Sequence, residues 1–234
     1  HKWYTFSDRF VLAYQYIELN RLKLRLKTYN LTGVLLNDNI VESIHLLEDS
    51  NENMSIEMYY DLKIYDDKII LIITDNNRFI PYPSELTFQA GRKYRQHIFT
   101  KNIYDTNLNL LSSQNLFGVN HNINSLKLEI SNNVLGLLYI TSNPDDINKK
   151  GTLYLTKYNI ETNLNIDFVG TDIMLKDYQY NIKFNPSSDE FKFTKLYDES
   201  YIISWIITQN KLYYFNINKY FSIEGERDKP GLIF

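Results

Sequence analysis

The chain has 234 residues, of which 44% are hydrophobic and 23% charged, and its formal net charge is −3. This length suits one large domain or two small ones, and the acidic balance argues against broad, non-specific nucleic-acid binding. No apolar run approaches the roughly 20 residues that span a bilayer, and the lack of cysteine excludes a disulfide framework, a thiolate metal site and a cysteine nucleophile.

One phrase recurs four times along the chain. Each copy has a moderately apolar run, a short polar connector and a dense apolar run. The copies are "KWYTFSDRFVLAYQYI" from Lys2, "LKIYDDKIILIIT" from Leu62, "LKLEISNNVLGLLYIT" from Leu126 and "TKLYDESYIISWIIT" from Thr194. The connectors begin at positions 7, 66, 131 and 198, and recurrence at a nearly fixed period is typical of repeat architectures.

Each dense run is followed by a polar turn and an alternating segment, which predicts a third strand. Turn and third strand together are expected in "ELNRLKLRLKTYNL", "DNNRFIPYP", "SNPDDINKKGTLYLTKYNI" and "QNKLYYFNIN", and two prolines interrupt the second of these. Candidates for a fourth, outer strand are Gly33–Leu36, Gln96–Lys101 and Leu164–Val169. The segment Asp38–Asp49 fits a short amphipathic helix about as well as a strand.

Four antiparallel strands per unit, with the inner ones most apolar, predict the blades of a β-propeller. We expect an all-β, β-propeller-like domain over residues 1–234, with units at 1–55, 56–123, 124–189 and 190–234. Four units are few for a closed ring, so the chain is interpreted as part of a larger propeller or a fragment of a longer protein. The alternative is two β-sandwich domains.

The segment "LKLEISNNVLGLLYIT…GTLYLTKYNI" resembles a WD-repeat blade in its layout of strand, polar turn, small-residue strand, turn and strand. The layout covers most of the chain in four copies. The Gly-His and Trp-Asp pairs of that family are absent, and the units exceed its usual 40 to 45 residues. The resemblance therefore concerns architecture.

No sequence motif predicts catalysis or a cofactor. The four histidines have no close partner at metal-ligand spacing, and phosphate-binding glycine loops and a nucleophile elbow are absent. The sialidase box S-x-D-x-G-x-T-W does not occur either, although a propeller hydrolase stays a minor alternative. We therefore predict no catalytic, cofactor-binding or metal-binding residue.

Two basic segments are candidates for binding a partner. The alternation of "RLKLRLK" places Arg21, Lys23, Arg25 and Lys27 on one face of a strand and the leucines on the other. The other segment, "GRKYRQHIFTK", interleaves Arg92, Lys93 and Arg95 with aromatic residues, a mixture that suits phosphate or nucleic acid. The structural alternatives are an edge strand protected by its charges and a loop whose aromatic residues are buried.

Candidate interface aromatics are Trp3, Tyr94, Tyr213 and Tyr214, because exposed Trp and Tyr often anchor interfaces. The leading hypothesis is a non-catalytic protein–protein interaction module within a larger assembly. The alternative is a viral or cell-surface structural or attachment protein built of β-sandwiches, for which glycan binding is one option. Sugars at the sequons Asn30 and Asn53 would favour this alternative. The absence of cysteine favours the cytoplasm or nucleus, with an extracellular or virion location as the alternative.

Overall fold

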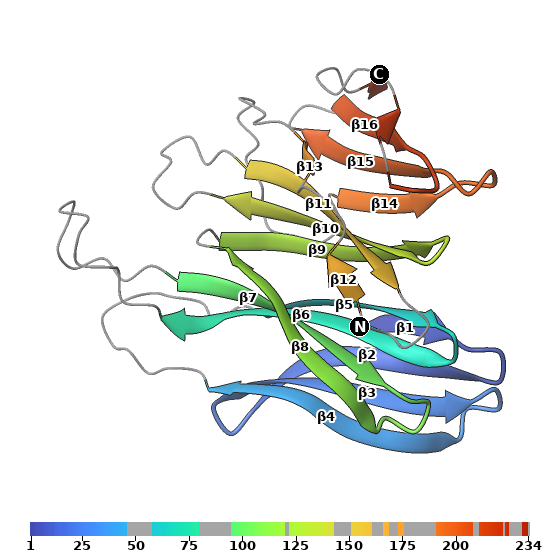
Figure 1. Ribbon diagram of the computed structural model, residues 1–234. Coiled ribbons are helices and arrows are strands. Elements are labelled where there is room, and N and C mark those ends of the chain that lie inside the picture. The colour runs from blue at the N-terminus through green and yellow to red at the C-terminus, as the bar shows by residue number, and fades with distance from the viewer. Residues whose placement is uncertain are drawn as a thin grey trace, which may run out of the picture. The chain divides into compact units, whose positions relative to one another are not determined.

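A computed structural model describes residues 1–45, 58–79, 95–119, 122–142, 151–160, 166–168, 173–175, 191–207, 211–221, 223–224 and 231–233. All regular elements in these ranges are β-strands, which confirms the all-β prediction (Figure 1). None of the described segments forms a helix that is long and apolar enough to cross a membrane. The chain divides into two compact units, His1–Asn120 and His121–Phe234.

The first unit contains two four-stranded antiparallel sheets, in which every strand pairs with its neighbour in sequence. Sheet A comprises β1 (Lys2–Thr5), β2 (Arg9–Glu18), β3 (Arg21–Asn30) and β4 (Leu35–His45). Sheet B comprises β5 (Met58–Tyr65), β6 (Lys68–Phe79), β7 (Arg95–Tyr104) and β8 (Leu110–Val119).

The second unit repeats this plan with shorter outer strands. In sheet C, β9 (Asn122–Ser131), β10 (Val134–Ser142) and β11 (Gly151–Ile160) are followed by β12 (Ile166–Phe168) and β13 (Ile173–Leu175), which both pair with β11. In sheet D, β14 (Phe191–Lys195), β15 (Tyr201–Ile207) and β16 (Lys211–Ile217) are followed by β17 (Ile223–Glu224) and β18 (Gly231–Ile233), which both pair with β16.

The four polar connectors lie at the hairpin between the first and second strands of each sheet, as the repeat predicts. In sheets B and C they are two-residue turns with positive φ at both positions, 49° and 56° at Asp66 and Asp67 and 48° and 60° at Asn132 and Asn133. Asp and Asn tolerate this left-handed geometry, and the resulting turn matches the twist of the flanking strands.

Two sequence predictions need correction. The segment "DNNRFIPYP" was expected to be the third strand of the second unit, but β6 continues through Asp75 to Phe79 across a break in register, and the third strand is β7. The predicted outer strand Gln96–Lys101 therefore lies within this third strand, and β8 is the outer one. The ambiguous segment from Asp38 is strand as far as His45, beyond which it lies outside the described residues.

A second loop motif recurs at the end of the third strand. Asn30, Asp105 and Asn218 each accept a hydrogen bond at the side-chain oxygen from the backbone N–H two residues later, at 2.9 to 3.1 Å. The residue three positions later has positive φ in every case: Gly33, Leu108 and Phe221. Leu108 and Phe221 are buried, so in sheets B and D this position inserts a large side chain into the core.

The core of the first unit lies between sheets A and B. It combines Val11, Ala13, Leu24 and Leu26 of sheet A with residues of sheet B such as Ile69. The side chains that contribute from sheet B are those of Met58, Leu62, Ile69, Leu71, Ile73, Tyr104 and Leu108. Ile70 and Ile72, on the opposite face of β6, are also fully buried. The apolar density of this strand thus reflects burial on both faces.

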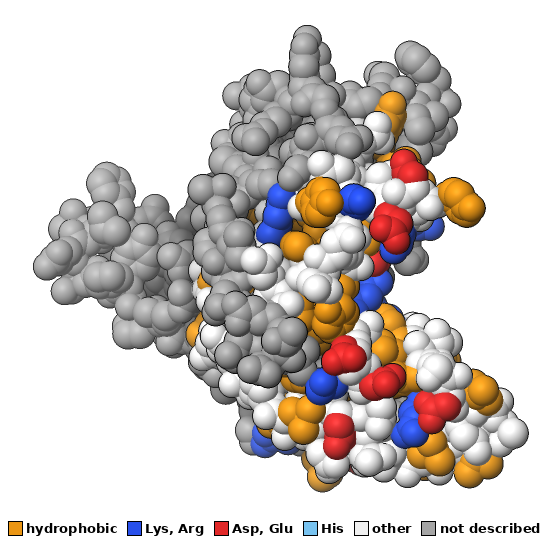
Figure 2. All heavy atoms as spheres, turned by 45° about the vertical axis from the view of Figure 1, so that its right-hand side comes forward, with side chains coloured by type: hydrophobic (Ala, Val, Ile, Leu, Met, Phe, Trp, Pro, Cys, Tyr) orange, Lys and Arg blue, Asp and Glu red, His pale blue; other side chains and the backbone are white. Residues whose placement is uncertain are grey.

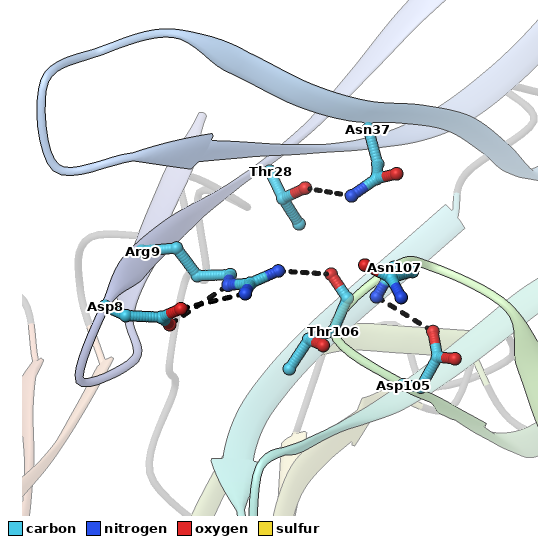
Figure 3. A network of polar contacts seen from close by, with 7 residues as sticks. All are labelled: Asp8, Arg9, Thr28, Asn37, Asp105, Thr106 and Asn107. Atoms are coloured by element: carbon cyan, nitrogen blue, oxygen red, sulfur yellow. Dashed lines mark hydrogen bonds and ion pairs between the residues drawn. The ribbon is translucent and has the colours of Figure 1, made fainter.

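Among the polar contacts that join the two sheets of the first unit, those from β1 and from the β1–β2 hairpin lie at two separate places. Lys2 donates to the carboxylate of Asp61 at 2.9 Å, and the Tyr4 hydroxyl donates to the same oxygen at 2.6 Å. Figure 3 shows the second place, where Arg9 is paired with Asp8 and also donates to the backbone carbonyl of Thr106 at 3.4 Å. In the second unit Asn132 donates to the carbonyl of Lys219, the equivalent loop position, at 3.4 Å.

Candidate functional site

The strand register of sheet A brings two separately predicted elements onto one surface. Trp3 is opposite Leu12, Leu12 is opposite Lys27, and Lys27 is opposite Asp38, so one row crosses all four strands. The next row along the strands contains Tyr14 and Arg25. The predicted interface aromatic Trp3 and the predicted basic strand therefore share one face of the sheet.

We call this surface the aromatic–basic face. It consists of Trp3, Phe10, Leu12, Tyr14, Tyr16, Lys23, Arg25, Lys27, Tyr29 and Asp38. Leu24 and Leu26, which alternate with its cations on β3, are fully buried in the core between sheets A and B. The predicted separation of leucines from cations on this strand is thus confirmed.

The aromatic rings of the face pack against one another. Phe10 and Tyr29 stack with their ring centroids 5.3 Å apart, and Trp3 lies 5.3 Å from Phe10 and 6.2 Å from Tyr29. Further along the face, Tyr14 stacks on His1 at 5.6 Å. Trp3 is 58% exposed even though it belongs to this cluster, and so it presents apolar area to solvent.

The cations of the face are held by carboxylates of the same sheet. Arg25 forms a two-pronged ion pair with Asp38, with N···O distances of 2.5 and 2.9 Å, and the Lys27 ammonium lies 3.6 Å from the same carboxylate. Arg25 also lies over the ring of Tyr16, and Lys27 lies over that of Tyr14, both at 5.9 Å from the ring centroid. These contacts hold the side chains of Arg25 and Lys27 in place along the surface of the sheet.

The hydrogen bonds of these ion pairs favour the charged forms. The bond to Asp38 raises the pKa of Arg25. Lys23 donates a hydrogen bond to the carboxylate of Glu18, and this bond lowers the pKa of Glu18. Figure 2 shows basic and acidic side chains beside one another among hydrophobic ones. Such a surface offers ionic, hydrogen-bonding and aromatic contacts together.

Apart from Arg21 of β3, the remaining predicted site residues belong to other sheets or lie outside the described residues. Arg92, Lys93 and Tyr94 lie outside the described residues, and Arg95 begins β7 but its side chain is not described. Tyr213 and Tyr214 are adjacent on β16 and so alternate between the two faces of sheet D. The Tyr214 side chain is half-buried, and that of Tyr213 is not described.

Sequence reasoning missed six of the ten residues of the aromatic–basic face. Phe10, Tyr14, Tyr16 and Tyr29 were interpreted as strand residues, and Asp38 as the start of an ambiguous segment. The alternation of "RFVLAYQYIE" in β2 carries a signal, because Phe10, Tyr14 and Tyr16 share the face opposite Val11 and Ala13. Asp38 carries no such signal, because its position depends on the pairing of β3 with β4.

Within the described parts of the chain, no group of three or more His, Asp or Glu side chains is placed to hold a metal ion. Comparison with known proteins finds no matching protein-family model and no similar curated protein.

Proposed function

We propose that the chain is a non-catalytic protein-interaction module, a subunit or domain of a larger assembly, whose sheets are propeller-type blades. The aromatic–basic face would bind a protein partner. One observation carries the proposal. The aromatic–basic face of sheet A is half-exposed, with Trp3 58% exposed, whereas the equivalent face of sheet B is aliphatic and buried.

The approach of the sheets within each unit supports the blade interpretation. In the first unit the backbones of sheets A and B approach each other at their first strands, β1 and β5. In the second unit β9 and β14, again the first strands, approach each other. Neighbouring blades of a propeller lie closest at the strands around the central channel, whereas the layers of a sandwich stay about 10 Å apart.

The direction in which sheets A and B pack also supports the blade interpretation. Steps are counted from Arg9 and Lys68, which begin β2 and β6 after their two-residue turns. The core side chains of β2 stand at even steps (Val11, Ala13), and those of β6 stand at odd steps (Ile69, Leu71, Ile73). The face that sheet A buries between the two sheets is therefore not the equivalent of the face that sheet B buries there. This front-to-back order is that of consecutive blades, whereas two sheets related by a two-fold axis would join equivalent faces.

The repeat also identifies what is special about the aromatic–basic face. Phe10, Leu12 and Tyr14 occupy the odd steps in β2, where β6 has Ile69, Leu71 and Ile73. Aliphatic residues at these steps are buried in sheet B, whereas sheet A has half-buried aromatic residues beside ion pairs. Aromatic residues and arginine are enriched at protein interfaces, where they carry much of the binding energy.

Comparative affinity capture tests this proposal. The wild-type chain, Trp3→Ser and the control Tyr197→Ser would be immobilised and exposed to an extract of the source organism, and bound proteins would be quantified by mass spectrometry. Tyr197 is fully exposed on the β14–β15 hairpin, so its replacement removes an exposed aromatic residue from another surface.

We expect one or a few proteins to be captured by the wild type and by Tyr197→Ser. Their capture should fall at least tenfold with Trp3→Ser, because an aromatic anchor that becomes buried at an interface is worth about 2 kcal/mol or more. Equal capture by all three chains would place the binding surface elsewhere. Turnover of a small substrate that is lost on mutation of a carboxylate would contradict the non-catalytic assignment.

A further inference from the structure

We infer that the partner presents an extended acidic segment to the aromatic–basic face, and that its carboxylates displace Asp38 from Arg25 and Lys27. This inference rests on the proposed function, since it assigns a chemistry to the protein that binds there. Two observations carry it: the spacing of the cations along β3, and the carboxylate of Asp38 that Arg25 and Lys27 already bind.

The cations of β3 form a column with a regular spacing. Arg21, Lys23, Arg25 and Lys27 occupy alternate positions of one strand, and alternate residues of a strand stand about 6.8 Å apart on the same face. An extended peptide has the same spacing between alternate side chains. Acidic residues at every second position of such a peptide would therefore match Arg25 and Lys27, and also Lys23 once its own partner Glu18 is displaced.

Asp38 shows that a carboxylate fits this column. Its two oxygens receive the fork of the Arg25 guanidinium at 2.5 and 2.9 Å, and Lys27 is 3.6 Å from it. The Arg25 side chain is 32% exposed and the Asp38 side chain 25% exposed, so solvent reaches the pair. Exposed ion pairs contribute little to stability, so an incoming carboxylate can replace Asp38 at small cost.

The aromatic residues favour a peptide over single-stranded nucleic acid. Bases need free ring faces, but Phe10 and Tyr29 already stack on each other, and His1 stacks on Tyr14. The rings of Tyr14 and Tyr16 also carry the cations of Lys27 and Arg25. What these rings offer is a continuous half-exposed apolar surface, which suits the side chains that alternate with acidic residues in a peptide.

The test measures binding of a fluorescent peptide of alternating Glu and Thr, about ten residues long, by polarisation at low ionic strength. A single-stranded oligothymidine with a similar number of charges is the second probe. The proteins are the wild type, Arg25→Gln, Lys27→Gln, Asp38→Asn and the control Lys68→Gln. Lys68 belongs to an exposed ion pair with Asp66 in sheet B of the same unit, so the control removes one equivalent charge. Thermal melting confirms that each variant is folded.

We expect Arg25→Gln and Lys27→Gln each to weaken peptide binding about tenfold, Asp38→Asn to strengthen it severalfold because the competing carboxylate is gone, and Lys68→Gln to leave it unchanged. Weaker binding in Asp38→Asn, equal losses in Lys68→Gln, or tighter binding of the oligothymidine than of the peptide would each overturn the inference. Absent peptide binding, with a captured partner that still depends on Trp3, would overturn this inference and leave the proposed function intact.

Discussion

The ring of Phe221 lies directly on Gly136, so that a Cβ atom added to the glycine would come within 2.9 Å of the ring. Phe221 has a φ of 54° and is fully buried, and Gly136 belongs to β10 of the neighbouring sheet. The residue at the equivalent loop position of the first unit is Leu108, which shares its core cluster with Val11. Compared with Leu108 and Val11 of the first unit, the inserted side chain of the second unit is larger and the residue beneath it is smaller.

We predict that Gly136→Ala destabilises the second unit by about 1–3 kcal/mol, because the added methyl group overlaps a ring that cannot move away within a packed core. Chemical denaturation measures the change. Phe221→Leu in the same background should recover part of the loss, since the smaller side chain makes room for the methyl group. Additive effects of the two substitutions would show that the contact does not limit stability.

Leu108 tests the value of the inserted side chain in the first unit. Its φ of 64° favours glycine by about 1 kcal/mol, but its side chain is buried in the core. We predict that Leu108→Gly is destabilising by about 1–3 kcal/mol, because the cavity costs more than the backbone gains. A neutral or stabilising effect in the same denaturation experiment would mean that the loop geometry outweighs the packing.

The contacts of Lys2 and Tyr4 with Asp61 predict a strong effect of a conservative substitution. Asp61 is 5% exposed, and Asp61→Asn removes the charge that faces the Lys2 ammonium while keeping the shape. We expect a loss of about 1–3 kcal/mol, measured by thermal or chemical unfolding. The matched control Asp8→Asn breaks the ion pair of an exposed carboxylate with Arg9 and should cost less than about 0.5 kcal/mol. Equal losses would contradict a special role for the buried pair.

Stability should fall at high pH through buried tyrosines. Burial, and then the charge of Asp61, raise the pKa of Tyr60 to about 12 from an ordinary value of 10.0. Because the folded pKa lies above the unfolded one, this contribution is fully present below pH 10 and disappears as the pH rises toward 12. Melting temperatures measured over this range should decline less steeply in Tyr60→Phe than in the wild type. Parallel curves would exclude this tyrosine as a cause.

The repeated hairpins could be predicted because short-range chemistry determines them. Asp66-Asp67 and Asn132-Asn133 combine tolerance of positive φ with dense apolar runs on one side, and both turns form where expected. The third strand of the second unit was missed for a related reason. The polar residues after Asp75 were interpreted as a turn, whereas β6 absorbs them at a break in register and continues to Phe79.

The aromatic–basic face was predictable only within single strands. Alternation predicted that Arg25 and Lys27 share a face, because period two is a local property of β3. Their pairing with Asp38 depends on the register of β3 against β4, which shifts at two places, between Leu24 and Arg25 and between Thr28 and Tyr29. Shifts of this kind are determined by packing of the whole sheet, so no segment of the sequence specifies them alone.

The most direct test of the central claim is the exposure of Trp3 with and without the captured partner. In a Trp205→Phe variant, Trp3 is the single tryptophan of the chain, and its emission and quenching by acrylamide report on the aromatic–basic face. Binding of the partner should shift the emission to shorter wavelength and reduce quenching severalfold, because a ring that is 58% exposed becomes buried. Unchanged emission and quenching in a complex shown to be saturated would contradict a partner on this face.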